Sequence, residues 1–166
     1  MLAILLPRGI RNNNPGNLRL SKTAWLGQKP APACAKPGLR SGEGRPQIDQ
    51  DFIEFTTALY GLRALMKVLL TYYFKYNLDT AECIINRFAP PHENATDSYI
   101  HHVAKALGVR RAEKIDLASK PVLTALARAI VLHENGRPPK GWPSGWYASD
   151  LYDKAASLVL PPTTVN

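Results

Sequence analysis

One carboxylate of this chain stands where a negative charge is unfavourable and where an acid could act in catalysis. The helical pattern of residues 119–136 carries an apolar stripe that reaches Ile130, and Glu134 is the next position on that stripe. Glu134 also falls in the last turn, where free carbonyls form a negative pole. Both effects favour the neutral carboxylic acid, the form that general-acid catalysis requires. The alternative is a helix-end glutamate that turns to solvent and pairs with Arg137 or Lys140.

A second segment, RGIRNNNPGNLR at residues 8–19, could present polar groups to a ligand. Asn and Gly tolerate positive φ, Pro fixes φ, and Asn side chains bond nearby backbone groups. Residues 12–17 are therefore predicted to form a tight polar loop, flanked by Arg8, Arg11 and Arg19. Such a loop either connects two elements or forms a wall of amide groups.

Other carboxylates remain open as partners in catalysis. Glu54 lies between two phenylalanines and could project from a short strand, and Glu93 precedes a predicted helix start. Asp49 and Asp51 are most simply interpreted as solvated loop charges.

The histidines do not predict a metal site. His101 and His102 are adjacent and point to different faces of a helix, while His92 and His133 lie elsewhere. The chain has no phosphate-binding loop, no serine nucleophile elbow and no aromatic-rich basic platform for nucleic acid. We therefore expect no metal, no cofactor and no nucleic-acid partner.

Helices are predicted for most of the chain after residue 56, because apolar residues recur at helical spacing between capping signals. The predicted starts are Thr56 or Thr57, Asp79 (with Glu82 in a capping-box pattern), Thr96, Ser119 and Ser149, and the predicted stops are Pro90, Gly108 and Gly136. Residues 20–50 are rich in Pro and Gly and predict a loop or irregular hairpin. The expected fold is mainly α, with a loop-rich N-terminal third and at most a small β-hairpin. Cys83 is expected in the core and Cys34 in a loop.

The chain has 166 residues, enough for one domain with a hydrophobic core, and we predict a single domain over 1–166. Its net charge of +8 favours a polyanionic partner, although the basic residues are scattered. The apolar start ends at Pro7 and is too short for a signal peptide or a membrane span. We expect synthesis in the cytoplasm, no stable membrane insertion, and delivery by another factor if the protein acts outside.

Several sequence blocks occur together over residues 8–136. They are RGIRNNNPGNLR, W.G, F..F followed by GLRAL, INRFAPPHENAT..Y and AIVLHENG. The combination resembles a family of phage and prophage proteins with structural or lytic roles in the virion and a lysozyme-like fold. This resemblance implies a bacteriolytic wall-cleaving domain, and other virion proteins as possible partners.

The same pieces resemble bacterial lytic transglycosylases and flagellar glucosaminidases in a rotated order. In those enzymes a helix ending in a catalytic Glu precedes an NN-x-x-G loop, a W-x-G, an F-x-x-F strand and a helix that places a Tyr beside the Glu. Here the Glu134–Asn135–Gly136 piece comes last, and Asn135 stands where Ser is usual. The rotated order implies a circular permutation, in which the catalytic helix packs beside the N-terminal loop.

The resemblance implies a role for each matching residue. Glu134 and Tyr99 would be the catalytic pair, while the substrate-binding residues would be Asn13, Asn14, Asn17, Trp25 (stacked on a sugar) and Thr96. The implied activity is a peptidoglycan glycosidase, either a lytic transglycosylase or a muramidase. It would cut the β-1,4 bond between N-acetylmuramic acid and N-acetylglucosamine in periplasmic glycan strands. The alternatives are a peptidoglycan endopeptidase, a non-catalytic virion or wall-binding protein, and a basic nucleic-acid-binding helical protein. The lack of a clustered basic helix argues against the last of these.

Overall fold

The computed structural model describes residues 6–31, 47–91 and 95–162, so Cys34 and Glu93 lie outside the described residues. The described part is mainly helical, as predicted. Its elements are α1 (Arg8–Arg11), α2 (Ala58–Tyr76), α3 (Ala81–Phe88), α4 (Thr96–Leu107), α5 (Lys120–Asn135) and α6 (Ser149–Ser157). Between α1 and α2, the described residues form only isolated antiparallel bridges, Arg19 with Phe52 and Gln28 with Phe55. The F-x-x-F segment is thus extended without belonging to a sheet.

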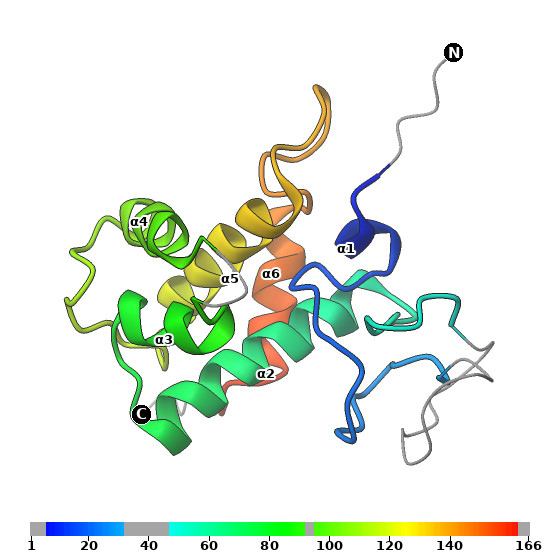
Figure 1. Ribbon diagram of the computed structural model, residues 1–166, viewed down its shortest axis with the longest axis horizontal. Helices are drawn as coiled ribbons and strands as arrows, with labels where there is room; N and C mark the ends of the chain where they lie inside the picture. The colour runs from blue at the N-terminus through cyan, green and yellow to red at the C-terminus, as the bar shows by residue number, and fades with distance from the viewer. Residues whose placement is uncertain (1–5, 32–46, 92–94, 163–166) are drawn as a thin grey trace.

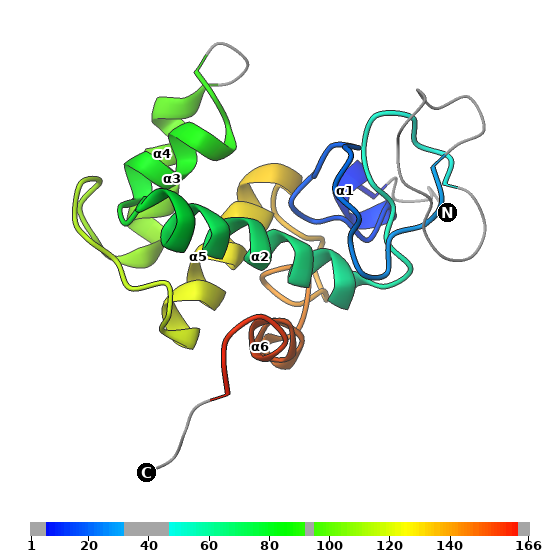
Figure 2. The same ribbon diagram turned by 90° about the horizontal axis from the view of Figure 1, so that it is seen from below.

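The long helix α2 connects the N-terminal segment, which includes α1, with the part of the molecule that holds α3 and α4. Figure 1 shows α3 and α4 near its C-terminal end and the N-terminal segment with α1 near its start. In Figure 2, α6 lies below α2, on the side away from α1. Helix α5 contacts α1, α2, α4 and α6, which makes it the central helix of the fold. Its C-terminal end therefore lies beside the N-terminal loop.

The core follows the predicted apolar stripes. Most buried side chains form one cluster between the helices, including Leu65 and Met66 of α2 and Leu126 and Ile130 of α5. A smaller cluster, built on Ile53 and Phe55, packs under the N-terminal segment. Within the described parts of the chain, no helix combines the length and the apolar character needed to cross a bilayer.

Most of the predicted helix ends are confirmed. Thr57 caps α2, with its hydroxyl accepting a hydrogen bond from the Tyr60 amide. Ser119 is the N-cap of α5, and α6 begins at Ser149. Gly108 ends α4 with a φ of 68°, and Gly136 ends α5 with a φ of 72°. These positions favour glycine because a β-carbon is strained at positive φ.

Three local predictions are wrong. Thr80, and not Asp79, caps α3, since its hydroxyl accepts from the Cys83 amide while Asp79 pairs with Lys114. Thr96 is the first residue of α4 and not its cap, because Ala95 holds that position. Cys83 is exposed, since it lies on the face of α3 opposite the buried Ile84 and Ile85.

The asparagine loop, residues 12–17, is a tight polar turn as predicted, and it packs directly on α2. Asn13 and Asn17 adopt positive φ values of 52° and 48°. The Asn13 carbonyl lies against Gly61, where any β-carbon would collide with it. A glycine inside α2 thus lets the loop approach the helix backbone.

Candidate functional site

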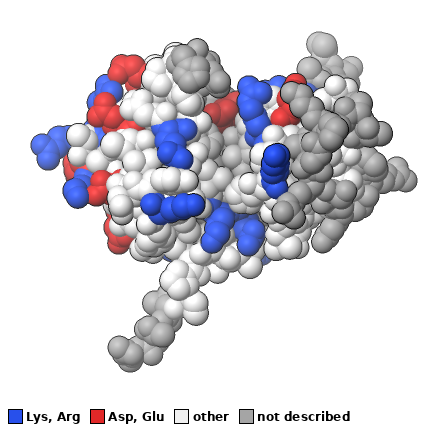
Figure 3. All heavy atoms as spheres, turned by 60° about the horizontal axis from the view of Figure 1, so that its bottom comes forward, with Lys and Arg blue, Asp and Glu red and all other residues white. Residues whose placement is uncertain are grey.

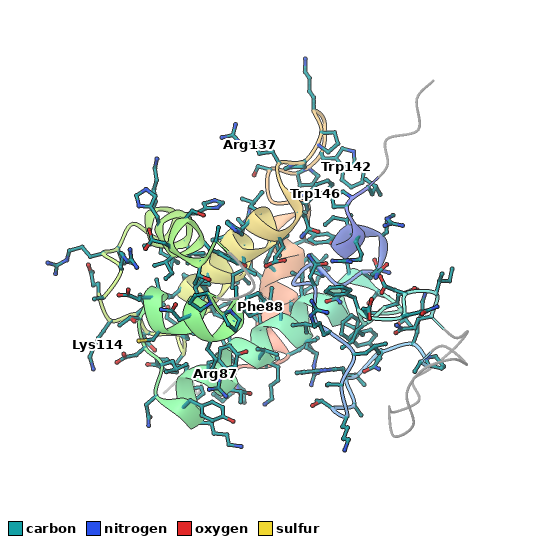
Figure 4. The ribbon with its side chains drawn as sticks, in the orientation of Figure 1. Arg87, Phe88, Lys114, Arg137, Trp142 and Trp146 are labelled. Carbon is teal, nitrogen blue, oxygen red and sulfur yellow. The ribbon has the colours of Figure 1, made fainter. Side chains whose placement is uncertain are left out.

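A cleft of about 330 Å³ opens between the asparagine loop and the end of α3, with the end of α5 beneath it. One side is formed by the N-terminal segment and the other by Phe88 and Ala89. The lining residues are Arg8, Gly16, Asn17, Leu18, Arg19, Phe52, Phe88, Ala89 and Glu134. Figure 4 shows Phe88 near the centre of the molecule, far from Trp142 on the loop that follows α5. Among the lining residues that the structure describes, Glu134 is the sole carboxylate.

The Glu134 side chain is held by one donor at each oxygen. The Asn17 amide donates to Oε2 at 3.0 Å, and the Tyr99 hydroxyl donates to Oε1 at 3.0 Å. Glu134 is half-buried and makes no ion pair with Arg137 or Lys140 in the described structure. The carboxyl group is therefore oriented in the cleft and does not turn away to solvent.

Tyr99 is suited to act as a fixed hydrogen-bond donor. It is only 2% exposed, and burial raises the pKa of its phenol well above the ordinary value. The neighbouring Glu134 charge and hydrogen bond raise that pKa further. The hydroxyl thus stays protonated and always presents its hydrogen to the Glu134 carboxyl.

A histidine pair supports the Tyr99 ring, which the sequence did not predict. The His133 ring stacks on it with centroids 3.6 Å apart and planes 11° apart, while Phe88 meets its other side edge-on at 6.5 Å. The Nδ1 atoms of His102 and His133 lie 3.2 Å apart, so one ring donates to the other. Burial lowers the pKa of His133, and His102 lowers it further. Tyr99 and His102 lie one helical turn apart on α4, and this spacing was the sequence signal that could have predicted a histidine near the Tyr99 ring.

The asparagines differ in what they do. The Asn14 side chain is fully buried and donates to the carbonyls of Leu18 and Ile53, so its predicted role as a substrate ligand is wrong. Asn13 donates to the Phe55 carbonyl at 3.2 Å and is likewise a structural residue. Of the three asparagines predicted to bind substrate, Asn17 alone lines the cleft.

Asn135 fastens the end of α5 to the asparagine loop. Its amide donates to the Pro15 carbonyl at 2.8 Å and to the Val131 carbonyl at 2.9 Å. The close approach of α1 to this point depends on Gly9, since a β-carbon there would collide with the Asn135 amide oxygen. On the other side, the Trp146 indole donates to the Gly136 carbonyl. Asn135 thus positions the asparagine loop relative to the helix end that carries Glu134.

Two other predicted ligands lie away from the cleft wall. Trp25 is half-buried against the cluster of Ile53 and Phe55, so it is not placed to stack on a sugar in the cleft. Thr96 is 4% exposed, and its hydroxyl donates to the Ala89 carbonyl at 2.7 Å. Thr96 therefore fixes the end of α3, one wall of the cleft, and does not itself reach a ligand.

The other carboxylates of the N-terminal segment stabilise its loops. Burial raises the pKa of Glu54, but the Asp49 amide, the Lys29 ammonium and the Ile48 amide outweigh it, so the pKa lies below the ordinary value. Burial likewise raises the pKa of Asp49, and hydrogen bonds from Phe52, Asn12 and Asp51 lower it more.

Neither Glu54 nor Asp49 lines the cleft with Glu134, and neither does Asp51. In the part of the chain that the structure describes, no three His, Cys, Asp or Glu side chains gather as metal ligands.

The sequence prediction missed the basic and aromatic lining of the cleft. Arg8, Arg19 and Phe52 come together from separate segments, and Phe88 was noted only as part of a helix stripe. The arginines that flank the asparagine loop were the sequence signal for a basic lining, but nothing local predicted their contact with Phe52.

Comparison with known proteins gives one informative match. No protein-family model matches the chain. The chain is 36% identical over 149 residues to protein P5 of Pseudoalteromonas phage PM2, a match that covers 84% of this chain and 82% of P5. The name of that phage protein states no activity. At this identity and coverage, the chain belongs to the family of the PM2 phage protein P5.

Proposed function

We propose that this protein is a phage peptidoglycan glycosidase that cuts the bond between N-acetylmuramic acid and N-acetylglucosamine. The observation that carries the proposal is the placement of Glu134. It is the sole carboxylate among the described lining residues of a cleft, and each of its oxygens accepts one hydrogen bond from a fixed donor. Preorganised hydrogen bonds of this kind hold an acid at one geometry without reorganisation during the reaction.

In the proposed reaction, protonated Glu134 gives its proton to the glycosidic oxygen as the bond from the sugar C1 to that oxygen breaks. The lining residues that the structure describes offer no second carboxylate as a nucleophile. The substrate's own N-acetyl oxygen would therefore attack C1. The Glu134 carboxylate would then take the proton of the muramic C6 hydroxyl, whose oxygen closes on C1 as the bond from the N-acetyl oxygen to C1 breaks and the acetamido group is restored. The product is a 1,6-anhydro sugar, and Glu134 ends protonated as it began.

Tyr99 and Asn17 have positioning roles in this scheme. The two donors fix the carboxyl plane between them, and Tyr99 is itself held by the stacked His133 ring. Because Asn17 also lines the cleft, it is the one asparagine able to touch the glycan.

The contacts of α5 support a permuted lysozyme-like fold as part of the proposal. The Asn135 amide bonds the Pro15 carbonyl across 120 residues of sequence, so the loop and the helix end meet without a direct connection. By contrast, α4 and α5 pack together and are joined by the short segment between Leu107 and Lys120. That is the arrangement expected if the chain was rejoined between those helices and opened between α5 and the loop.

Digestion of purified sacculi by the native protein and by Glu134→Gln tests the function, with the products identified by mass spectrometry. We expect anhydro-muramyl ends from the native protein and at least a hundredfold slower release from the variant. Asp51→Asn is the matched control, because it also changes a carboxylate to its amide and Asp51 does not line the cleft.

Each other result has a defined meaning. Reducing ends would indicate a muramidase that uses water, and free peptide ends would indicate an endopeptidase. Binding to sacculi without release of fragments would indicate a non-catalytic wall-binding protein. Full activity in Glu134→Gln would refute the assignment of the acid.

A further inference from the structure

The wall of the cleft opposite Phe88 carries two arginines stacked on one aromatic ring. The Arg8 guanidinium carbon lies 3.5 Å from the centroid of the Phe52 ring, and that of Arg19 lies 4.8 Å from it. All three side chains line the same cleft as Glu134. They come from α1, from the segment after the asparagine loop, and from the segment that precedes α2.

Both guanidinium groups are available to a ligand. Neither forms a hydrogen bond or an ion pair through its side chain with any residue that the structure describes. Arg8 does lower the pKa of Asp49 through its charge, but the Asp49 oxygens already accept from Asn12, Asp51 and Phe52. Ring stacking orients a guanidinium while leaving its N–H groups free to donate in the plane.

We propose that Arg8 and Arg19, spaced by Phe52, form a subsite in the Glu134 cleft for a carboxylate carried by the glycan strand. This inference rests on the proposed function. The sugar rings of that substrate offer neutral hydroxyl and acetamido groups, which need no cation. The fork of an arginine matches a carboxylate in both shape and charge. Peptidoglycan offers two such groups, the lactyl carboxylate of peptide-free muramic acid and the carboxylates of its stem peptides.

Binding to three tetrasaccharides tests the subsite. The full-length Glu134→Gln protein is used, so that no ligand is consumed, and calorimetry gives the affinity. The ligands are neutral chitotetraose, a peptide-free muramyl tetrasaccharide, and the same tetrasaccharide with stem peptides. We expect at least one carboxylate ligand to bind about tenfold more tightly than chitotetraose, as one charge-assisted pair provides. The muramyl ligand that shows the preference identifies the source of the carboxylate.

Two sets of variants then locate the effect. Adding Arg8→Gln and Arg19→Gln should remove the preference while chitotetraose binding changes less than about twofold. Adding Lys67→Gln and Lys105→Gln is the control, since it removes the same charge from exposed positions on α2 and α4 outside the cleft. Arg8→Lys with Arg19→Lys keeps the charge and loses the fork, and we expect it to retain only part of the preference.

The outcomes separate the two proposals. Equal binding of all three ligands, or an equal loss in the control and the arginine variants, would overturn the carboxylate subsite and leave the glycosidase intact. Binding of none of the three would overturn the proposed function and this inference with it. If the variant with Arg8→Lys and Arg19→Lys keeps the preference in full, the subsite is also overturned. Attraction between opposite charges, without the fork of an arginine, would then explain the preference.

Discussion

At the scale of single residues, the candidate site is built around one carboxyl group whose two oxygens each accept a hydrogen bond from a donor that other contacts hold in place. Glu134 accepts from Asn17 and Tyr99, and each donor is fixed by further contacts. The Asn17 backbone is held in a left-handed turn with a φ of 48°, and the Tyr99 ring lies between His133 and Phe88. The Glu134 carboxyl group is therefore positioned by its neighbours as much as by its own helix.

Replacing Tyr99 with Phe should slow catalysis without unfolding the protein. The change removes one hydrogen bond to Glu134 and keeps the ring stack, so we expect kcat to fall about tenfold. Product release from sacculi at saturating substrate measures it. Tyr152→Phe is the control, because its buried hydroxyl donates to the Gly145 carbonyl away from the cleft. That variant should lose about 1 kcal/mol of stability and keep its kcat. An unchanged kcat in Tyr99→Phe would contradict the positioning role.

The His102–His133 pair should make stability depend on pH. Burial and then His102 lower the pKa of His133 below 6.5, so the unfolded chain takes up the proton first as pH falls. The contribution of neutral His133 to the free energy of unfolding should therefore be fully present above pH 6.5 and should decline as pH falls below that value. His133→Gln should flatten the decline below about pH 6.5 in urea titrations. The exposed His101→Gln is the control, and equal slopes in all three proteins would exclude the effect.

At the scale of elements, the site depends on how closely the asparagine loop approaches two helices. Gly61 lets the Asn13 carbonyl approach the backbone of α2 closely, because it has no β-carbon. Gly9 likewise lets α1 approach the Asn135 side chain of α5. The Asn135 amide then ties α5 to the loop through the Pro15 carbonyl. The loop is thus clamped between the first helical turn of the chain and the last turn of α5.

Gly61→Ala tests the packing of the asparagine loop on α2, because helix propensity alone predicts the opposite result. Alanine favours an isolated helix by about 1 kcal/mol, but here its β-carbon would collide with the Asn13 carbonyl. We expect a net loss of about 1–3 kcal/mol in the free energy of unfolding, measured by urea denaturation. Cys83→Ala, at an exposed position of α3, should change it by less than about 0.5 kcal/mol. A stabilised Gly61→Ala protein would show that the loop is not packed on α2.

At the scale of the whole molecule, the face seen in Figure 3 carries its positive charge at scattered positions. Figure 3 shows Lys and Arg side chains distributed across one face and not gathered into a single patch. With a net charge of +8, such a surface would attract the anionic wall of the proposed function from many orientations. The cleft, with its two stacked arginines, would then select the part of the strand that binds.

The rate of sacculus digestion should therefore fall as salt is added. Screening shortens the range of attraction to about 10 Å at 0.1 M salt, so we expect a roughly threefold to tenfold lower initial rate at high ionic strength. Thermal denaturation at the low and at the high salt concentration used for the rates checks that the fold is unchanged. A rate that does not respond to salt would show that the net charge plays no part in encounter.

Much of the fold could be predicted from the sequence because it depends on neighbours in the chain. Thr57, Ser119 and Gly136 mark helix ends through backbone groups within one turn, and the stripe that ends in Glu134 follows from helical periodicity alone. The same local rules failed where two candidates competed, as at Asp79 and Thr80, because both types can cap a helix.

What only the tertiary structure decided is which side chains share the cleft. Asn14 and Asn17 are the same residue type three positions apart, yet one is buried among carbonyls and the other reaches Glu134. Arg8, Arg19 and Phe52 meet only because the segment before α2 folds back on the N-terminal loop. Local propensity is read from a few adjacent residues, whereas these contacts join segments brought together by burial of a common core. Helical periodicity in the sequence by itself determined the helix that carries Glu134, and packing determined which side chains surround its carboxyl group.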